Sequence, residues 1–385
     1  MSKCPYQQYD LWRVAEKRTI CDLADSGPGL AKTQAGHLLA FFGTPHGTEQ
    51  HDAMAEEVAA LGPARVMMSR STDGGLTWSE PLALPAPNGL DVHYGMPSCA
   101  LALPSGRIVL VVRSHEHGAD RDDWFFADHH AYHSDDDGQN WTIGKAIDRA
   151  PAVGNRAYAG GEIQQMGGIL ILGYQGTLSP EEHDANTYSA FFYRSYDEGL
   201  TWEDPSVLIR PQGHCKLAAE PSLAVLEDGR WIALVRYHGP EDCCRTVRIE
   251  SSDEGRTWSE LAHLFVGGMG CLRSLPGGGL MVSHVTTAGI VVRFSYDEGW
   301  NWTREVMAYD IWAGGHYRNG AAWNQSALVI DDDTILCGYT SVAPDDPNKD
   351  LYYGARKAEW GLAARIRFLR RQRDRSLTVP LEAGA

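Results

Sequence analysis

Apolar residues recur along this chain in short stretches separated by glycine-rich turns, and this pattern predicts β-strands throughout. Residues 64–69, 190–194 and 290–294 alternate between apolar and polar positions, as half-buried strands do. Residues 96–113 and 220–236 each contain two nearly continuous apolar runs joined by a turn, as expected of strands buried on both faces. Fainter copies of this second pattern begin near Pro28, Gly160, Gly270 and Gln325. The six copies predict six similar β-sheets.

A second motif, S-x-D-x-G-x-x-W, follows the alternating strands. Its five copies begin at Ser71, Ser134, Ser195, Ser251 and Ser295. The intervals between them, roughly 45–65 residues, suit a four-stranded unit plus its loops. The Asp side chain can accept hydrogen bonds from nearby backbone N–H groups, the Gly permits positive φ, and the Trp covers the turn. The motif therefore predicts a hairpin held together by its own side chains.

These copies resemble the Asp-boxes of the sialidase superfamily, whose members are β-propellers. The resemblance implies Asp-boxes at the periphery of the sheets, away from the chemistry. With the six strand patterns, it predicts an all-β fold, a six-bladed β-propeller with five Asp-boxes. We expect a single domain over residues 1–385, with short tails at 1–8 and 374–385. The strand predicted at 12–20 should pair with the last strand, at 362–369, and close the ring.

The composition limits the classes of ligand and macromolecule that we expect this protein to bind. The formal net charge of −16 disfavours nucleic acid and anionic membranes, whereas 12 Trp and 16 Tyr suit a sugar-binding surface. The eight cysteines lack zinc-binding spacing and are expected to be reduced. No signal peptide or long apolar run is evident, so we expect a cytoplasmic protein. We expect no cofactor and no catalytic metal, although residues 120–123 and 128–133 could hold a structural ion. The oligomeric state is left open.

Polar residues just before the innermost strands of a propeller converge on one funnel at its axis. Two of them are carboxylates from neighbouring blades, Glu162 and Glu220. A pair of carboxylates is what acid-catalysed glycoside cleavage requires, so we predict that both are catalytic. The alternative is that one or both are structural, with Glu162 a solvated loop carboxylate.

Cationic and aromatic residues accompany this pair. Arg236 and Arg113 end the second strands of two blades at matching places, where a guanidinium could fork onto a carboxylate or hydroxyls of a substrate at the funnel rim. For Arg113 the alternative is a structural role on backbone carbonyls. The other predicted substrate-binding residues are His93, Tyr94, Arg156, His238, Tyr317 and Arg318.

Glu220 and Arg236 also resemble the sialidase Glu that activates the catalytic Tyr and the Arg that follows it. Elsewhere the chain departs from the family. Ser26-Gly27-Pro28 replaces the first Arg motif, Thr287 the third Arg, and Gln325 the nucleophilic Tyr. The resemblance therefore implies the fold but not the usual hydrolysis of sialic acid.

Three functions fit these residues. The leading one is an exo-acting glycoside hydrolase of short oligosaccharides, arranged like the exo-arabinanases, which resemble sialidases in fold and use two glutamates from neighbouring blades. The second is a lyase that cleaves at a uronic acid by β-elimination, with His93, Tyr94 or His238 as base. The third is a non-catalytic glycan-binding propeller, against which the retained pair of Glu220 and Arg236 argues. Sugar, linkage and stereochemistry are left open.

Overall fold

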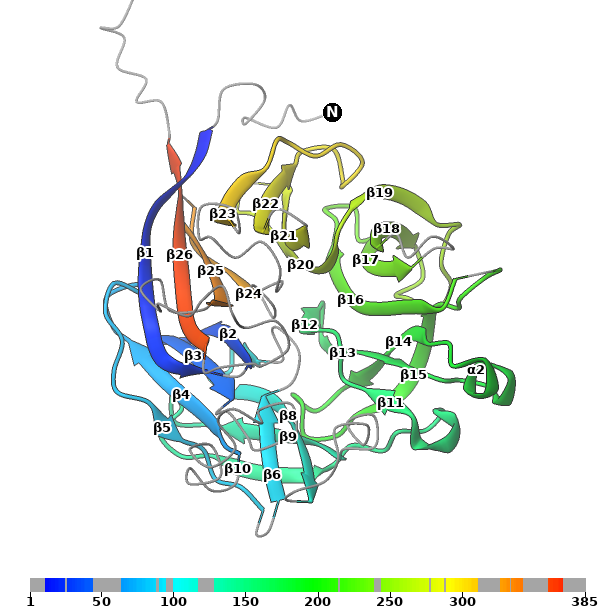
Figure 1. The fold of residues 1–385 in the computed structure, drawn as a ribbon, viewed down its shortest axis with the longest axis horizontal. Coiled ribbons are helices and arrows are strands. Elements are labelled where there is room, and N and C mark those ends of the chain that lie inside the picture. Colours follow the sequence, from blue (N-terminus) through cyan, green and yellow to red (C-terminus); the bar gives the residue numbers. More distant parts are fainter. Residues whose placement is uncertain are drawn as a thin grey trace, which may run out of the picture.

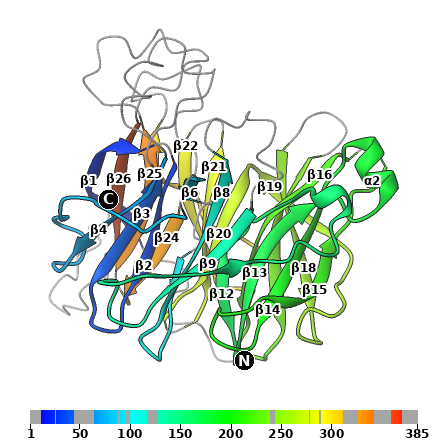
Figure 2. The ribbon, with the colours of Figure 1, turned by 90° about the horizontal axis from the view of Figure 1, so that it is seen from below.

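A computed structural model describes residues 11–24, 26–43, 64–87, 90–94, 100–116, 128–213, 215–238, 244–276, 278–286, 289–310, 326–332, 334–341 and 359–369. These residues form six antiparallel sheets arranged in a ring about a central axis (Figure 1). Figure 2 shows the same ring edge-on, with the strands running between its two faces. The prediction of an all-β propeller is confirmed.

The first three sheets follow one another along the chain. The first contains β2 (Ser26–Lys32), β3 (Leu38–Gly43), β4 (Val66–Ser71) and β5 (Leu82–Ala83). The second contains β6 (Leu90–Tyr94), β7 (Ala100–Ala102), β8 (Ile108–Glu116), β9 (Asp128–Ser134) and β10 (Thr142–Ala146). The third contains β11 (Ala157–Tyr158), β12 (Ile163–Met166), β13 (Ile169–Gly176), β14 (Ser189–Ser195) and β15 (Glu203–Ile209). A 3-10 turn, η3 (Val153–Asn155), and a short helix, α2 (Pro180–Ala185), accompany the third sheet.

The last three sheets complete the ring. The fourth contains β16 (Leu217–Val225), β17 (Trp231–His238), β18 (Cys244–Ser251) and β19 (Ala262–Val266). The fifth contains β20 (Gly268–Ser274), β21 (Leu280–Thr286), β22 (Gly289–Ser295) and β23 (Val306–Asp310). The sixth contains β24 (Ser326–Asp331), β25 (Thr334–Ser341), β26 (Glu359–Leu369) and the N-terminal strand β1 (Leu11–Ala24).

Strand β1 closes the ring, as predicted. It pairs antiparallel with β26, from Leu11 opposite Leu369 to Ala24 opposite Glu359. The sixth sheet therefore combines strands from the two ends of the described chain, which lie side by side in Figure 1. No helix in the described part is long and apolar enough to cross a membrane.

The first strand of each sheet lies nearest the axis, and apolar side chains fill the space between neighbouring sheets. One such layer contains Val109 of the second sheet against Tyr174 and Phe191 of the third. Residues of β2, β7, β12, β16, β20 and β24 together line a central cavity of about 320 Å³. The hydrophobic core is thus divided into layers between sheets.

The inner strands are irregular near their starts. The pairing register shifts between Ser26 and Gly29 in β2, between Ala219 and Ser222 in β16, and between Gly268 and Cys271 in β20. In the second and third sheets the inner edge is split into two short strands, β6 with β7 and β11 with β12. Such bulges release backbone groups from the ladder and redirect side chains, often beside functional sites.

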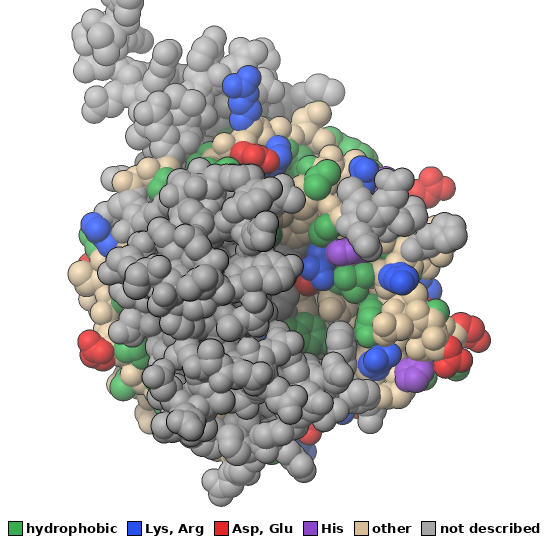
Figure 3. All heavy atoms as spheres, viewed as in Figure 1, with side chains coloured by type: hydrophobic (Ala, Val, Ile, Leu, Met, Phe, Trp, Pro, Cys, Tyr) green, Lys and Arg blue, Asp and Glu red, His purple; other side chains and the backbone are tan. Residues whose placement is uncertain are grey.

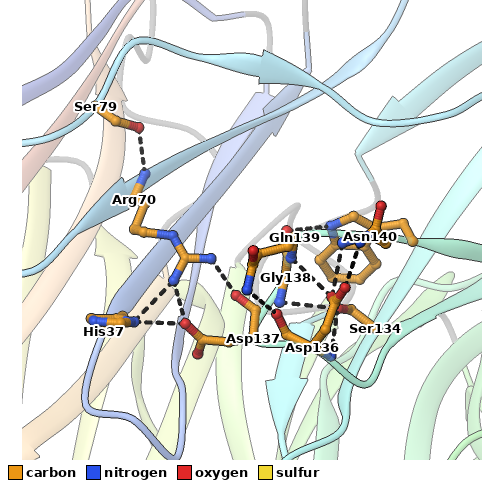
Figure 4. Close-up of polar contacts among 10 residues, drawn as sticks. His37, Arg70, Ser79, Ser134, Asp136, Asp137, Gly138, Gln139 and Asn140 are labelled. Carbon is orange, nitrogen blue, oxygen red and sulfur yellow. Dashed lines mark hydrogen bonds and ion pairs between the residues drawn. The ribbon is translucent and has the colours of Figure 1, made fainter.

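The five S-x-D-x-G-x-x-W copies fold alike. In each, the Ser hydroxyl accepts the N–H of the motif Gly at 2.8–2.9 Å. In the second copy, Asp136 accepts the N–H groups of Gln139 and Asn140 at 3.1 and 2.8 Å, and Trp141 Nε1 donates to Gly138 O at 3.1 Å (Figure 4). The hydrogen bonds inferred from the motif are therefore present.

The same turns also join neighbouring sheets. Arg70 of β4 donates to the carbonyl and, at 2.5 Å, to the carboxylate of Asp137, which precedes the Gly of the next sheet's motif (Figure 4). The fully buried Arg194 and Arg248 reach the corresponding carbonyls of Glu254 and Glu298 at 2.8 and 3.2 Å. Each arginine thereby fixes one sheet against the turn of the next.

The Asp-box carboxylates should make stability depend on pH. Hydrogen bonds from the backbone and side chain of Asn140 lower the pKa of Asp136 from 3.8 to about 2. Because the folded pKa is the lower one, this stabilisation is present above pH 3.8 and is lost as the pH falls toward 2. We expect Asp136→Asn to reduce the free energy of unfolding by about 1 kcal/mol at pH 6, since the group is largely solvated. Denaturant titrations should show the difference shrinking toward pH 2; a constant difference would contradict this.

Candidate active site

The starts of the inner strands and the Asp-boxes lie on opposite faces of the ring. Each inner strand runs away from the first face, and the two antiparallel strands after it bring the chain to the Asp-box turn on the second. Glu220 lies in the first half of β16, Glu162 just before β12, and Arg236 near the end of β17, all toward the first face. Figure 3 views this face and shows a hollow near the axis, with acidic, basic and histidine side chains in it or on its edge.

Glu220 has an unusual backbone. Its φ is +51°, and it lies with Pro221 in the bulge where the β16–β17 register shifts. Its side chain is only 4% exposed, and its Oε2 lies 3.2 Å from Arg236 Nε. Its N–H donates to Gln175 Oε1 of the third sheet at 3.2 Å. A non-glycine residue at positive φ costs free energy, so the surrounding contacts must hold it there.

Close backbone packing between the third and fourth sheets sets the place of this bulge. A Cβ on Gly161 would lie 2.6 Å from Gly173 Cα and 2.7 Å from the carbonyl oxygen of Pro221. Real Cβ atoms do not approach backbone so closely, so a side chain here would push β16 away. The absence of one lets Pro221, and with it Glu220, lie directly against the third sheet.

Gly161→Ala should therefore destabilise the fold and impair the site. We expect a loss of about 1–3 kcal/mol in the free energy of unfolding, because the added methyl meets backbone rather than a flexible side chain. Gly168→Ala, in the β12–β13 turn, is the matched control, since nothing lies within 4 Å of a Cβ there. Denaturant titration of both variants checks the expectation, and equal stabilities would contradict it.

Glu162 is held by an ion pair. Its side chain is 3% exposed, and Arg273 of β20 contacts both carboxylate oxygens, at 2.8 and 2.9 Å. The Ser222 hydroxyl also donates to Glu162 Oε2, and it accepts the N–H of Leu272 at 2.8 Å. Glu162 thus links the inner strands of the third, fourth and fifth sheets.

The two predicted catalytic carboxylates lie at different levels. Gly173 donates its N–H to Glu162 O at 3.0 Å, whereas Ser222 pairs with Leu234. Gly173 and Leu234 are equivalent, because each follows at the same spacing the residue that pairs with the Asp-box serine of its sheet. Glu162 is therefore level with Ser222 and not with Glu220. Glu162 and Glu220 therefore differ in level by two residues along their strands. Glu162 lies deeper in the ring, next to the central cavity that Arg273 lines.

Arg113 is not exposed at a rim, contrary to the expectation. Its side chain is 5% exposed and its guanidinium lies 4.5 Å from the ring centroid of Tyr158 in the third sheet. Within the second sheet, Arg113 pairs with His93 of β6 on one side and with His129 of β9 on the other. Complete burial lowers the pKa of His129 well below its ordinary range, and Arg113 lowers it further. The neutral His129 ring accepts the N–H of Ala159 at 3.2 Å.

The other predicted binding residues are spread around this face. Arg156 is half-buried and donates to Asn186 Oδ1 at 3.1 Å, and half-buried His238 ends β17. His93 and Tyr94 lie in β6, opposite Arg113 and Val112. Tyr317, Arg318, Thr287 and Gln325 lie outside the described residues.

Gln175 is a further residue of the candidate site, and no motif in the sequence pointed to it. Ile108, Leu170 and Trp231 pair with the Asp-box serines of their sheets, and Arg113, Gln175 and Arg236 follow them at the same spacing. Aligning the repeats on the serines would have placed Gln175 with the two arginines. No group of three or more metal-binding side chains occurs in the described residues, and residues 120–123 fall outside them.

The ring of sheets with Asp-box turns, together with a buried Glu–Arg pair on one face, defines a sialidase-like β-propeller. The BNR repeat-like domain matches residues 65–311, and the chain belongs to this family. No curated protein sequence matches the chain.

Solved structures share the fold at low sequence identity. A protein of unknown function from Dyadobacter fermentans is 18% identical, with a TM-score of 0.71 over 93% of this chain and 99% of that one. The α-L-arabinanase of Penicillium chrysogenum, solved with arabinobiose, is 16% identical, with a TM-score of 0.62 over 93% and 99%. A Hadza microbial sialidase, Hz136, is 18% identical, with a TM-score of 0.61 over 90% and 68%. The similarity to glycoside hydrolases is one of fold.

Proposed function

We propose that this protein is an exo-acting glycoside hydrolase of short oligosaccharides and that Glu220 is the carboxylate that meets the substrate. The observation that supports the proposal most directly is the state of Glu220, a buried acid at positive φ that is ion-paired with Arg236 in the half of β16 nearer the hollowed face. Strained backbone of this kind often occurs at functional sites. The arabinobiose complex of the Penicillium arabinanase, of the same fold, supports a small carbohydrate ligand.

In this proposal, the two carboxylates have different roles in the reaction. In its protonated form, Glu220 transfers a proton to the leaving glycosidic oxygen, and Glu162 stabilises the positive charge that develops at the anomeric carbon. A water molecule then bonds to that carbon and releases the proton that restores the acid. Arg273 balances the charge of Glu162, and Arg236 orients Glu220. Arg113, His93, Tyr94, Arg156, His238, Tyr317 and Arg318 remain proposed substrate-binding residues.

The architecture favours attack on a chain end. We take each sheet as one blade, so that the propeller has six blades closed by β1. Bonds among Glu162, Ser222 and Arg273 join three inner strands deeper in the ring than Glu220. A hollow that these bonded side chains close at its inner end accepts the end of an oligosaccharide more readily than its middle, because the chain cannot pass through. Short oligosaccharides would also suit the cytoplasmic location, which stays a prediction.

Conventional sialidase activity is not proposed. Strand β2 carries Ser26, Gly27 and Pro28 where the family's first arginine motif would stand, so no guanidinium from this strand is available to a sialic acid carboxylate. The proposed substrate is therefore a neutral or differently charged sugar, with an arabinosyl oligosaccharide as the first candidate.

The test is incubation with sialylated, arabinosyl, rhamnosyl and uronate oligosaccharides, with product mass and ultraviolet absorbance read together. Release of a terminal sugar with uptake of one water, without new absorbance, is the expected result. Cleavage without water uptake, giving an unsaturated uronate that absorbs, would replace the hydrolase with a lyase. Binding without cleavage across the panel would favour a glycan-binding propeller.

A further inference from the structure

We propose that Gln175 is a positioning residue for Glu220, acting through the hydrogen bond from the Glu220 N–H to Gln175 Oε1. The inference rests on the proposed function for its catalytic consequence. Its geometric part, that Gln175 fixes the backbone of the β16 bulge, can be tested without any substrate.

The bulge leaves one buried backbone donor to be satisfied. Pairing between β16 and β17 passes from Ala219 opposite Arg236 to Ser222 opposite Leu234, and the two residues between lie outside the ladder. Pro221 has no N–H, so Glu220 supplies the bulge's only backbone donor. That N–H donates to Gln175 at 3.2 Å. A buried N–H without an acceptor is costly, so this conformation depends on Gln175.

Among the equivalent residues of three sheets, only Gln175 can serve as this acceptor. Arg113 and Arg236 occupy the same place in the second and fourth sheets, and a guanidinium has donors but no acceptor. Each side chain meets the sheet that follows: Arg113 lies over Tyr158, and Arg236 packs where a Cβ on Gly268 would be. The third sheet has an amide where its neighbours have guanidinium groups, and this amide accepts the Glu220 N–H, which lies outside the β16–β17 ladder.

The surroundings of Gln175 hold its amide in place. The side chain is 7% exposed, and the backbone pairs with Tyr158 on one side and Ala190 on the other. A Cβ on Gly160 would lie 2.8 Å from Gln175 Oε1, so glycine there leaves room for the amide. Gln175 therefore lies between the third and fourth sheets and is largely shielded from solvent.

Glu220 is consequently fixed at two points, its N–H by Gln175 and its carboxylate by Arg236. Without the amide oxygen, the Glu220 backbone can relax from φ +51° toward the negative values that non-glycine residues favour. That rotation turns the carboxylate away from the reacting bond. The effect falls on the reaction step, because Gln175 itself does not contact the substrate in this arrangement.

The experiment compares three variants. Gln175→Met keeps the side-chain length but removes the oxygen, and Gln175→Glu keeps an oxygen at the same place. Gln164→Met is the matched control, because Gln164 also accepts a β16 N–H, that of Leu223 at 2.5 Å, but does not touch Glu220. The readouts are kcat and KM on the cleaved oligosaccharide and hydrogen–deuterium exchange over residues 217–225.

We expect Gln175→Met to lower kcat about 10–100-fold with KM within about threefold. Exchange at the Glu220 amide should be at least about tenfold faster in this variant and remain slow in Gln175→Glu. Gln164→Met should keep kcat within about threefold, whatever it does to stability. Gln175→Glu adds a negative charge beside Glu220, which should raise the pKa of this proton donor and move the alkaline limb of the pH–rate profile upward.

The outcomes separate the two proposals. Unchanged exchange or unchanged kcat in Gln175→Met overturns the positioning role. Equal losses of kcat in Gln175→Met and Gln164→Met also overturn it, because the effect would then be general loosening of β16. If the wild type cleaves no glycan but the Glu220 amide loses protection only in Gln175→Met, the geometric inference stands and the proposed hydrolase fails.

Discussion

Glu220→Gln is expected to reduce kcat for glycoside cleavage by about 10²–10⁴-fold while the protein stays folded. The amide has the shape of the acid, so it keeps the backbone bond to Gln175 and an oxygen toward Arg236. It cannot transfer the proton that the leaving oxygen needs. The measurement is kcat on the oligosaccharide identified in the panel, together with thermal unfolding.

Glu227→Gln is the matched control for this prediction. Glu227 lies in the turn between β16 and β17 of the same sheet and is exposed to solvent. The variant should leave kcat unchanged. Undiminished turnover of Glu220→Gln, with an unchanged unfolding temperature, would remove Glu220 from the mechanism.

Glu162→Gln is expected to destabilise the fold by about 2–4 kcal/mol, the largest stability effect that we predict. It leaves the Arg273 guanidinium without the carboxylate that contacts two of its nitrogens. Removing one partner of a buried ion pair costs more stability than removing both, because the remaining charge is left buried without compensation. Arg273 is 21% exposed, so we expect a value below that of a fully buried pair. Denaturant titration at neutral pH gives the free energy of unfolding.

The double variant Glu162→Gln with Arg273→Met separates structure from catalysis. Stability should recover by at least about half of the loss, because no uncompensated charge remains. Turnover should stay low if Glu162 stabilises the charge on the sugar, as proposed. Recovery of both stability and turnover would show that Glu162 serves only the ion pair and that the chemistry depends on Glu220 alone.

The fold could be predicted from the sequence because its repeating unit is local. The Asp-box bonds join residues within one motif, such as Ser134 to Gly138 and Asp136 to Asn140, so the residue types alone determine the turn. Ring closure by β1 could be predicted because the N-terminal strand belongs to none of the six strand patterns. The last of these patterns also lacks an Asp-box, so its sheet has a place for that strand. Contacts between sheets, such as Arg70 with Asp137, leave no comparable pattern in the sequence.

Proximity within the candidate site could be predicted only for residues of one hairpin. Glu220 and Arg236 lie on adjacent strands joined by a short turn, and their proximity follows from the pairing. Glu162 and Arg273 come from sheets that are not neighbours in the chain, so their ion pair depends on the curvature of the ring. The level of Glu162 depends on the observed register, because the β12–β13 turn is short and makes Glu162 equivalent to Ser222. The buried state of Arg113 depends on Tyr158 from the next sheet.

The most direct test of Glu220 as the proton donor is a crystal structure of Glu220→Gln with the oligosaccharide that the wild type cleaves. We expect the sugar in the hollow on the face where the inner strands begin, with the scissile oxygen about 3 Å from the residue 220 amide. A sugar bound on the Asp-box face or in the central cavity, with residue 220 out of contact, would contradict the assignment of this face as the active site.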